Sequence, residues 1–582
     1  MVTLTGYVVN GVSSVGNHLS NLPANEAIIF DIAVILIISA MFGFIAKILR
    51  QPLIPAYVLA GLIIGPLVLG LVKNWDLIHA FSEIGIAFLL FTAGLEISFR
   101  KLKEANLKKI ALIGLLQAGI IFGIVIFFAG FLNLSSLQAA YIGIILTMGS
   151  TMVNVKLLSD RNELATLHGR LVVGILLFED LVAIVAIIIF TTGGFAIASL
   201  TTAFAKLIVI LIMAIVLQRY VLNRLFKFAA RSGELLLLSS LAVLFFFIIS
   251  AYLLELSIVV GAFIAGISLA NSQFKIELES RISPLRDFFA ILFFVALGMQ
   301  LIFSGIGERL ILLIALIVGA SLIRPITILI LMRVTGYQPR TSFLTAISLS
   351  QLSEFALIIG MVGVTVGALD MSIFSTVVLA TIITMSIAPY IAKYKGDLYH
   401  HFFKYPVSLL NFLPIKEIPE YRSKSSKEIL MIGSHRMGGA IMEELLHKKN
   451  KLLVVDYNPD IINFLMKKKI SCIYGDITSP ELLDKIDMKK LKLVISTIPD
   501  YESSLYLLKK IKRINPRVKI ILTGSRISET LSLYGGGADY VITPKILSGE
   551  KIAKIVHSKN YDLKKAKRKH LRHLGSVHNI LY

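Results

Sequence analysis

The sequence predicts a multi-span α-helical membrane domain followed by a smaller α/β domain of the doubly wound, Rossmann-like kind. The 582 residues are 56% hydrophobic and only 16% charged, whereas soluble domains are about 25% charged. The mean hydropathy is +0.81. Up to Lys395 the chain is a series of long apolar runs, and beyond it short β-type runs alternate with helical stretches. This alternation is typical of a parallel sheet covered by helices.

Thirteen apolar runs approach or reach the length of about 20 residues that a bilayer-spanning helix needs. They lie at 26–49, 53–71, 82–99, 109–132, 135–158, 167–191, 203–221, 234–253, 256–272, 287–304, 308–332, 341–367 and 370–394. Basic residues gather in the loops after odd-numbered runs and are scarce in the other loops. The positive-inside rule therefore places the N-terminus outside and the C-terminal domain in the cytoplasm. One missed run would scramble this alternation, so the alternation also supports the count.

These patterns divide the chain into five parts. We expect an extracellular N-terminal segment at 1–25, a membrane domain at 26–395, an interfacial linker at 396–427, an α/β domain at 428–557 and a basic tail at 558–582. The N-terminal segment lacks the basic region and apolar core of a cleavable signal. Cys472 is the single cysteine, so an intramolecular disulfide is excluded.

Two adjacent carboxylates, Glu179 and Asp180, lie in the middle of the sixth apolar run. A charge at mid-bilayer costs roughly 2.5–3.5 kcal/mol even on lenient scales, so such residues usually mark ion or proton pathways. Carboxylate oxygens are also the ligands that hard cations prefer. A site that holds either a cation or a proton is the minimum machinery of an antiporter. The alternative is a structural ion pair inside a helix bundle.

Polar residues also interrupt two other runs. The fifth run contains Ser150, Thr151 and Asn154, and the twelfth contains a serine-rich stretch, 348–354, that ends at Glu354. Because these runs are an odd number of spans apart, they have opposite orientations, as an inverted repeat requires. Interrupted segments at matching places in two inverted halves predict crossing broken helices around a mid-membrane site. The alternative is that the hydroxyls bond only to the preceding helical turn.

A basic residue, Arg324, lies well inside the eleventh run and needs a carboxylate partner. Glu179 and Glu354 are both candidates, whereas Glu255 lies near an outer boundary and is expected to be interfacial. Arginine does not deprotonate in proteins. If Arg324 pairs with Glu179, that pair stays charged and only Asp180 titrates, which predicts exchange of one cation for one proton. If Arg324 pairs with Glu354, Glu179 is available to carry a second proton.

The C-terminal part contains six expected strands, at 428–433, 451–456, 471–475, 491–497, 518–524 and 539–542. The first strand leads into the turn Gly433, Ser434, His435, Arg436, Met437, Gly438, and the second strand ends at Asp456. This spacing is typical of a dinucleotide fold, in which phosphate lies on the first helix N-terminus and the acid binds the ribose. His435 stands where a glycine is usual, so two alternatives stay open: the domain binds a mononucleotide, or it binds no nucleotide.

The formal net charge of +22 and the dense basic run at 559–573 raise the question of nucleic-acid binding. In a membrane protein, cytoplasmic basic loops explain such a charge more simply. We expect the tail to meet an anionic leaflet or solvent, and we do not expect nucleic acid as a partner.

Several motifs resemble the monovalent cation/proton antiporters, in the branch that contains glutathione-gated potassium efflux systems and bacterial sodium/proton exchangers. The motifs are Gln51-PLIPAYVLAGLIIG-Pro66, Glu83-IGIAFLLFTAGLE-Ile97, Ser150-Thr151 with Lys156-Leu157-Leu158, Phe178-Glu179-Asp180, Gly261-AFIAGISL-Ala270, Phe293-FVALG-Met299 and Gln351-LSE-Phe355. The C-terminal half is similar to the RCK/TrkA-N-type domains that regulate potassium conductance and transport. The motifs there are Gly433 to Gly438, Asp456, Gly475-Asp476 and Gly537-ADYVIT-Pro544.

The resemblance implies an elevator-type fold with a core domain, a dimerisation domain and hence a homodimer. It also implies that Asp180 binds cation and proton in turn, and that Asp456 and Asp476 belong to a nucleotide site. The sequence departs from its relatives at three positions. Glu179 stands where relatives carry Asp, Asn or Gln, Arg324 stands where several carry Lys, and His435 replaces a glycine.

We therefore expect a secondary antiporter of the prokaryotic plasma membrane that exchanges Na⁺ or K⁺ for H⁺. The expected ion site comprises Asp180, Glu179, Ser150, Thr151, Asn154, Arg324 and Glu354. No obligatory cofactor is expected, and the expected regulatory ligand is a nucleotide such as AMP, ATP or NAD(H). An ion channel gated by the same soluble domain is the alternative, but the sequence lacks a TVGYG-type filter. A membrane-anchored oxidoreductase would need acid–base groups for which the sequence offers no candidate.

Overall fold

The computed structural model describes residues 24–403 and 420–557 together with Leu563 and Lys567. Within these ranges it leaves out 73–74, 97–106, 161–162, 165, 192–196, 231, 271, 303–306, 338, 422–426, 435–436, 457–458, 476, 478–481, 484–485 and 499–500. The chain forms two compact units, one made mainly of the helices up to Val407 and one made mainly of Ser408 to Tyr582. Most of the predicted N-terminal segment, linker and basic tail therefore lies outside the described residues.

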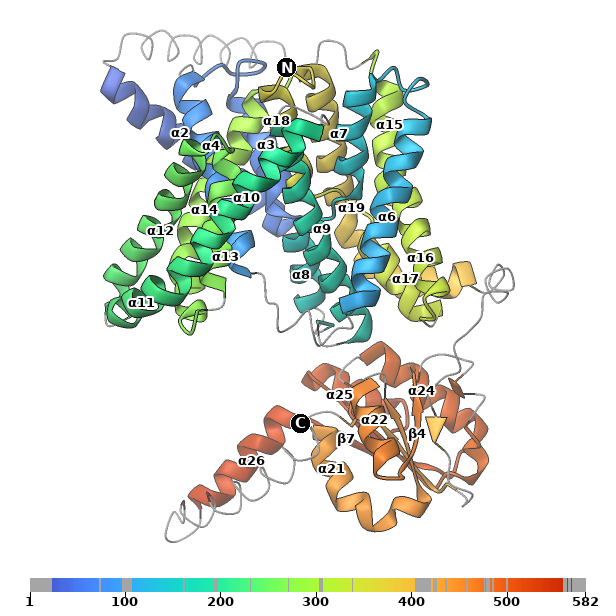
Figure 1. The fold of residues 1–582 in the computed structure, drawn as a ribbon. Helices are drawn as coiled ribbons and strands as arrows, with labels where there is room; N and C mark the ends of the chain where they lie inside the picture. Colours follow the sequence, from blue (N-terminus) through green and yellow to red (C-terminus); the bar gives the residue numbers. More distant parts are fainter. Residues whose placement is uncertain are drawn as a thin grey trace, which may run out of the picture. The chain divides into compact units, whose positions relative to one another are not determined.

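The first unit is an all-helical bundle (Figure 1). Its helices are α2 (Ala24–Ile48), α3 (Leu53–Ile64), α4 (Trp75–Glu96), α6 (Leu107–Phe127), α7 (Ser136–Thr147), α8 (Thr151–Asp160), α9 (Leu167–Thr191), α10 (Ile197–Leu217), α11 (Asn223–Ala229), α12 (Gly233–Leu253), α13 (Ile258–Ala270), α14 (Lys275–Met299), α15 (Leu310–Val318), α16 (Arg324–Val334), α17 (Pro339–Ser348), α18 (Glu354–Thr365) and α19 (Met371–Phe403). Two π-helical segments, Gln218–Leu222 and Gly319–Ile323, join α10 to α11 and α15 to α16.

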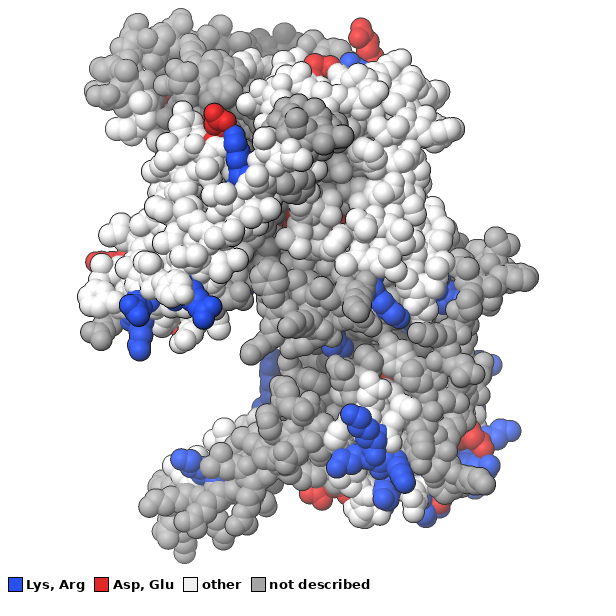
Figure 2. All heavy atoms as spheres, in the orientation of Figure 1, with Lys and Arg blue, Asp and Glu red and all other residues white. Residues whose placement is uncertain are grey.

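Within the described residues, nine helical spans are long and apolar enough to cross a membrane, and four shorter apolar helices accompany them. Each of these coincides with one of the thirteen expected runs. The tenth begins earlier than expected, at Lys275 rather than near 287, because a charged first half with Pro284 continues the same helix. Charged side chains are sparse over the visible surface of this unit, and Lys and Arg gather toward the end where α11 and α17 lie (Figures 1 and 2).

The helices pack in two sets. One set contains α2, α3, α4, α10 and α12–α14, and the other contains α6, α7, α8, α9, α15, α16, α18 and α19. Glycines allow very close approach in the first set: a Cβ on Gly298 would collide with the backbone carbonyl of Val58, and one on Gly266 with that of Phe91. By contrast, Gly119 faces open space.

Buried apolar side chains of both sets share one continuous core, but close helix–helix contacts between the sets are few among the described residues. The most extensive one among the described residues is that of α3 with α19. Two hydrogen bonds supplement it: Gln51 Nε2 donates to Tyr390 Oη at 3.0 Å, and the Ile302 amide donates to Ser375 Oγ at 3.0 Å.

The second unit is a seven-stranded sheet with the order β1-β4-β3-β2-β5-β6-β7. The strands are β1 (Glu420–Tyr421), β2 (Ile429–Ile432), β3 (Leu452–Asp456), β4 (Ser471–Tyr474), β5 (Leu493–Ser496), β6 (Lys519–Thr523) and β7 (Tyr540–Ile542). All neighbours are parallel except β1 with β4. The six expected strands are therefore present, and β1 is an addition from the predicted linker. The intervening helices are α21 (Met437–Leu445), α22 (Pro459–Lys467), α24 (Tyr501–Ile514), α25 (Ile527–Gly535) and α26 (Pro544–Val556).

The end of α24 is fastened to the edge of this sheet by an ion pair. Lys512 Nζ lies 2.9 Å from Asp539 Oδ2, which also accepts the Ile520 amide at 2.8 Å. Burial opposes ionisation of Asp539, but these hydrogen bonds outweigh it and lower the pKa of the Asp539 carboxyl below its ordinary value.

Candidate ion and nucleotide sites

The fifth span is a broken helix. It ends as α7 at Thr147 and resumes as α8 at Thr151, and the peptide between them is extended at Met148. Irregular backbone at membrane depth leaves polar groups that only buried partners or a cavity can satisfy. Here the Gly149 amide donates to Glu179 Oε2 at 3.0 Å. The break is therefore held by a side chain from α9.

The twelfth span is broken in the same way, between α17 and α18. Residues 349–353 are non-helical, and Ser353 caps α18 by accepting the Phe355 amide at 3.1 Å. The Gln351 carbonyl accepts a hydrogen bond from Arg324 Nη1 at 3.0 Å, and the Leu352 amide donates to Thr384 Oγ1 at 3.3 Å. The second break is therefore held by α16 and α19.

A fully buried ion pair connects the two breaks. Arg324 Nη2 lies 2.6 and 2.7 Å from the two carboxylate oxygens of Glu179, and the side chains are 0% and 3% exposed. The arginine also reaches Gln351 in one break, and the glutamate also accepts from Gly149 in the other. Of the two candidate partners of Arg324, the structure selects Glu179.

The π-helical segment ahead of Arg324 has a local cause. Pro325 lacks the N–H that would continue α-helical bonding to the turn before it, so the chain takes a wider turn over Gly319–Ile323. This wider turn sets the face of the helix on which the guanidinium lies.

Asp180 is buried beside the ion pair, with 7% of its surface exposed. It accepts a hydrogen bond from Thr151 Oγ1, at the first residue of α8, at 3.0 Å. A helix N-terminus favours a negative charge. The carboxylate and the hydroxyl provide two oxygen ligands of the type that a monovalent cation can use.

Glu354 lies at the other side of the crossing and is 4% exposed. It contacts the Ser150 hydroxyl and the Met152 backbone, and Ser353 Oγ lies 3.3 Å from its Oε2. Asn154 Nδ2 donates to the Ser150 carbonyl at 2.9 Å. Glu354 thus joins the start of α18 to the start of α8.

The seven residues expected at the ion site therefore converge on the crossing of the two broken helices. The sequence did not predict roles for Gly149, Gln351 and Thr384. Gly149 and Gln351 contribute a backbone amide and a backbone carbonyl, and Thr384 accepts a hydrogen bond from the Leu352 amide. Gly149 and Gln351 belong to the interrupted segments, so the polar pattern pointed to their neighbourhood. Thr384 carries no comparable signal. Glu255 lies apart from the site and pairs with Lys206 at 2.6 Å, which fits the interfacial position expected for it.

In the second unit, the two glycines at the ends of the turn after β2 are placed as in a nucleotide-binding loop. Gly433 has a φ of +80°, and a Cβ on Gly438 would collide with its carbonyl oxygen, so both positions require glycine. Met437 begins α21, which follows this turn. The sheet order reverses between β2 and β5, and such a switch point is where ligands bind in open α/β sheets.

Asp456 ends β3 next to this turn. Its Oδ2 accepts hydrogen bonds from the Ser434 amide at 2.6 Å and the Ser434 hydroxyl at 3.3 Å. The carboxylate therefore orders the turn. His435, Arg436 and Asp476 lie outside the described residues.

Comparison with known proteins agrees with both halves of this description. Residues 33–393 match the family model "Sodium/hydrogen exchanger, transmembrane", and residues 429–544 match the TrkA-N domain, a nucleotide-binding regulatory domain. The glutathione-regulated potassium-efflux system proteins KefC of Escherichia coli K12 and of Escherichia fergusonii are each 28% identical over 500 residues. The match covers 83% of this chain and 77% of the relative in both cases.

Solved structures give weaker likenesses. The sodium proton antiporter MjNhaP1 of Methanocaldococcus jannaschii is 18% identical with a TM-score of 0.45, covering 64% of this chain and 98% of that one. The TrkA-N domain of the Escherichia coli inner membrane protein ybaL is 18% identical with a TM-score of 0.22, covering 23% of this chain and all of that one. On the family match, which covers more than half of its length, this chain belongs to the sodium/hydrogen exchanger family and carries a C-terminal TrkA-N domain.

Proposed function

We propose that this protein is a secondary antiporter that exchanges a monovalent cation, Na⁺ or K⁺, for H⁺, with Asp180 as the carrier of both. The observation that carries the proposal is the buried Asp180–Thr151 contact where two broken helices cross. The family match supports it. Ser150, Asn154 and Glu354 shape the crossing around this carrier.

The packing in two helix sets supports an elevator mechanism. Close helix–helix contacts are concentrated within each set, so one set can slide against the other while its own packing is kept. The ion site lies wholly within the second set, which would carry it across the membrane. By the positive-inside rule the N-terminus lies outside and the C-terminal domain in the cytoplasm of a prokaryotic cell. We propose that the transporter works as a homodimer.

The test is cation-induced proton movement in proteoliposomes, followed with a trapped pH dye and each alkali metal in turn. Asp180→Asn keeps the shape of the side chain and removes its charge, so exchange should be abolished while the protein still purifies as a folded species. Retained exchange in this variant would exclude Asp180 as the carrier. Cation flux without proton movement in the wild type would favour a channel instead.

Exchange should be electroneutral, one cation for one proton. The Glu179–Arg324 pair is fully buried and held at both ends, so we expect it to stay charged throughout the cycle. Asp180 is then the single carboxylate of the adjacent pair that titrates.

The TrkA-N domain should bind an adenine nucleotide that regulates transport. We propose that the turn from Gly433 to Gly438 holds the phosphates, that Asp456 lies on the ribose, and that Asp476 belongs to the same nucleotide site. The positive φ of Gly433 and the close approach of Gly438 support this assignment. Calorimetry of the full-length protein in detergent with AMP, ATP, NAD and NADH is the test. Asp456→Ala should abolish any heat of binding, and a folded wild type that binds none of the four would contradict the assignment.

A further inference from the structure

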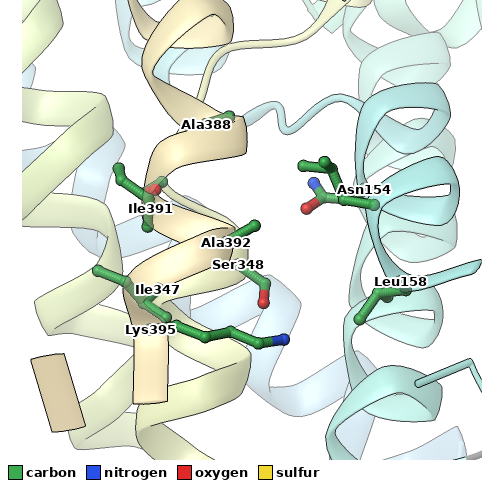
Figure 3. Close-up of a pocket in the computed structure, with 10 residues that line it drawn as sticks. Asn154, Leu158, Ile347, Ser348, Ala388, Ile391, Ala392 and Lys395 are labelled. Atoms are coloured by element: carbon green, nitrogen blue, oxygen red, sulfur yellow. The ribbon is translucent and has the colours of Figure 1, made fainter. Parts of the chain in front are cut away.

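A small cavity lies beside the crossing, between α8, the end of α17 and the second half of α19 (Figure 3). Its volume is about 10 Å³, at the lower limit of what a cavity needs to hold one water molecule. It is lined by Asn154, Leu157 and Leu158 of α8, by Ile347, Ser348 and Ser350 at the end of α17, and by Ala388, Ile391, Ala392 and Lys395 of α19. Each broken helix thus contributes one of its halves, α8 or α17, to the wall.

Lys395 has an unusual position in this cavity. A lysine near the end of a membrane helix normally extends its long side chain toward water, and Lys393 on the same helix is indeed exposed. Lys395 is only 6% exposed. Its side chain runs across the cavity from α19 toward α8, and its ammonium lies below the Ser348 hydroxyl (Figure 3). The small side chains of Ala388 and Ala392 leave the space that it crosses.

The polar groups of the wall favour a cation over an anion. The hydroxyl hydrogen of Ser348 is used on its own helix, because Ser348 Oγ donates to the Leu344 carbonyl at 2.7 Å, so its lone pairs are left to face the cavity. The Asn154 amide donates one N–H to the Ser150 carbonyl at 2.9 Å, and its oxygen points into the cavity (Figure 3). The C-terminus of α17, which ends at Ser348, adds negative partial charge.

We propose that this cavity is a second site for the transported monovalent cation, next to the crossing, and that the Lys395 ammonium competes for it as a tethered cation. The inference rests on the cation transport proposed above. The Asn154–Ser150 hydrogen bond connects the cavity wall directly to the first break. A cation that reaches Asp180 from the side at which α19 ends would meet these oxygens first.

The position of Lys395 on α19 also connects the cavity to the C-terminal unit. Pro389 lies six residues before Lys395 within α19 and removes a helical hydrogen bond there, which makes bending easier at that point. Beyond Lys395 the helix continues to Phe403, and the next described element along the chain is β1 of the second unit. Bending of α19 at Pro389 would move the Lys395 ammonium relative to the cavity wall.

The first test is the cation dependence of proton movement in proteoliposomes. Lys395→Met removes the charge and keeps the length of the side chain, Lys395→Arg keeps the charge, and Lys393→Met is the matched control on the exposed face. Loss of a neighbouring unit charge should lower the apparent KM for the cation by about fivefold in the Met variant. The Arg variant and the control should retain the wild-type KM. An unchanged or raised KM in the Met variant would overturn the proposal.

The second test does not depend on transport. Melting of the detergent-solubilised protein is followed against KCl and NaCl, with choline chloride as the ionic-strength control. In an Asp180→Asn background, the added Lys395→Met change should create a saturable, cation-dependent stabilisation that Asp180→Asn alone lacks. A double variant that is insensitive to both cations would show that Lys395 only holds the end of α17.

Lys395→Gln is a second neutral variant, which can still form hydrogen bonds, and it replaces the Met variant if that one does not fold. It should give the same fall in KM. If neither neutral variant folds, Lys395 is structural and the proposal is wrong. If the wild type shows no cation-dependent proton movement, the proposed function fails, whereas the melting comparison still tests the cavity.

Discussion

Replacing Glu179 with alanine should strongly destabilise the helical unit. Arg324 is 0% exposed and would be left without its counter-ion, and breaking a buried pair by removing one partner costs about 3–5 kcal/mol. The Gly149 amide would lose its acceptor, which adds about 1–3 kcal/mol for an unsatisfied buried group. The expected loss of unfolding free energy is therefore at least about 4 kcal/mol.

The assay is thermal melting of the purified protein in detergent, arranged as a double-mutant cycle with Arg324→Met. The double variant has no buried charge at this position, so it should melt well above Glu179→Ala. Asp180→Asn leaves the ion pair intact and should melt close to the wild type. Equal destabilisation of Glu179→Ala and the double variant would refute the idea that an uncompensated arginine causes the loss. A Glu179→Ala variant that melts like the wild type would do the same.

Three further outcomes follow from individual contacts. Thr151→Val removes the hydroxyl on Asp180 and should raise the KM for the cation roughly tenfold, as expected for a lost hydrogen bond to a charged group, while Thr151→Ser should restore it. Gly298→Ala should prevent recovery of folded protein after membrane extraction, whereas Gly119→Ala, whose Cβ would face open space, should be recovered at wild-type yield. The pKa of the Asp539 carboxyl is lowered in the folded state. The ionised carboxylate therefore stabilises the folded domain above its unfolded-state pKa, and this contribution is lost as pH falls through the folded-state pKa. Asp539→Asn should therefore lower the melting temperature of the TrkA-N domain at pH 7, and the difference from wild type should vanish in strong acid.

The broken helices could be predicted from sequence because polar side chains at membrane depth need a specific reason. Ser150, Thr151 and Glu354 marked the two breaks. The partner of Arg324 could not be chosen, because a sequence gives the depth of a residue along its span and not the rotation of the helix. The π-helical turn over 319–323 changes that rotation, and a regular helical period does not predict it.

The cavity beside the crossing was also beyond sequence reasoning. Lys395 follows the last apolar run, where a lysine is expected to contact water and lipid headgroups. In the sequence it therefore indicates only the end of the membrane domain. Its burial depends on Ala388 and Ala392 facing the ends of α8 and α17, which are distant in sequence. In the TrkA-N domain the strand pattern predicted the fold closely, but the hydrogen bonds between Ser434 and Asp456 were not foreseen.

The most direct test of the central claim, that Asp180 alone titrates beside a permanently charged Glu179–Arg324 pair, is current measurement on a solid-supported membrane. Proteoliposomes are exposed to Na⁺ or K⁺ gradients while a pH dye confirms proton movement in the same preparation. We predict proton movement without a sustained transport current, because each cation replaces one proton. A sustained current that reverses with the cation gradient would show net charge movement and contradict one-for-one exchange.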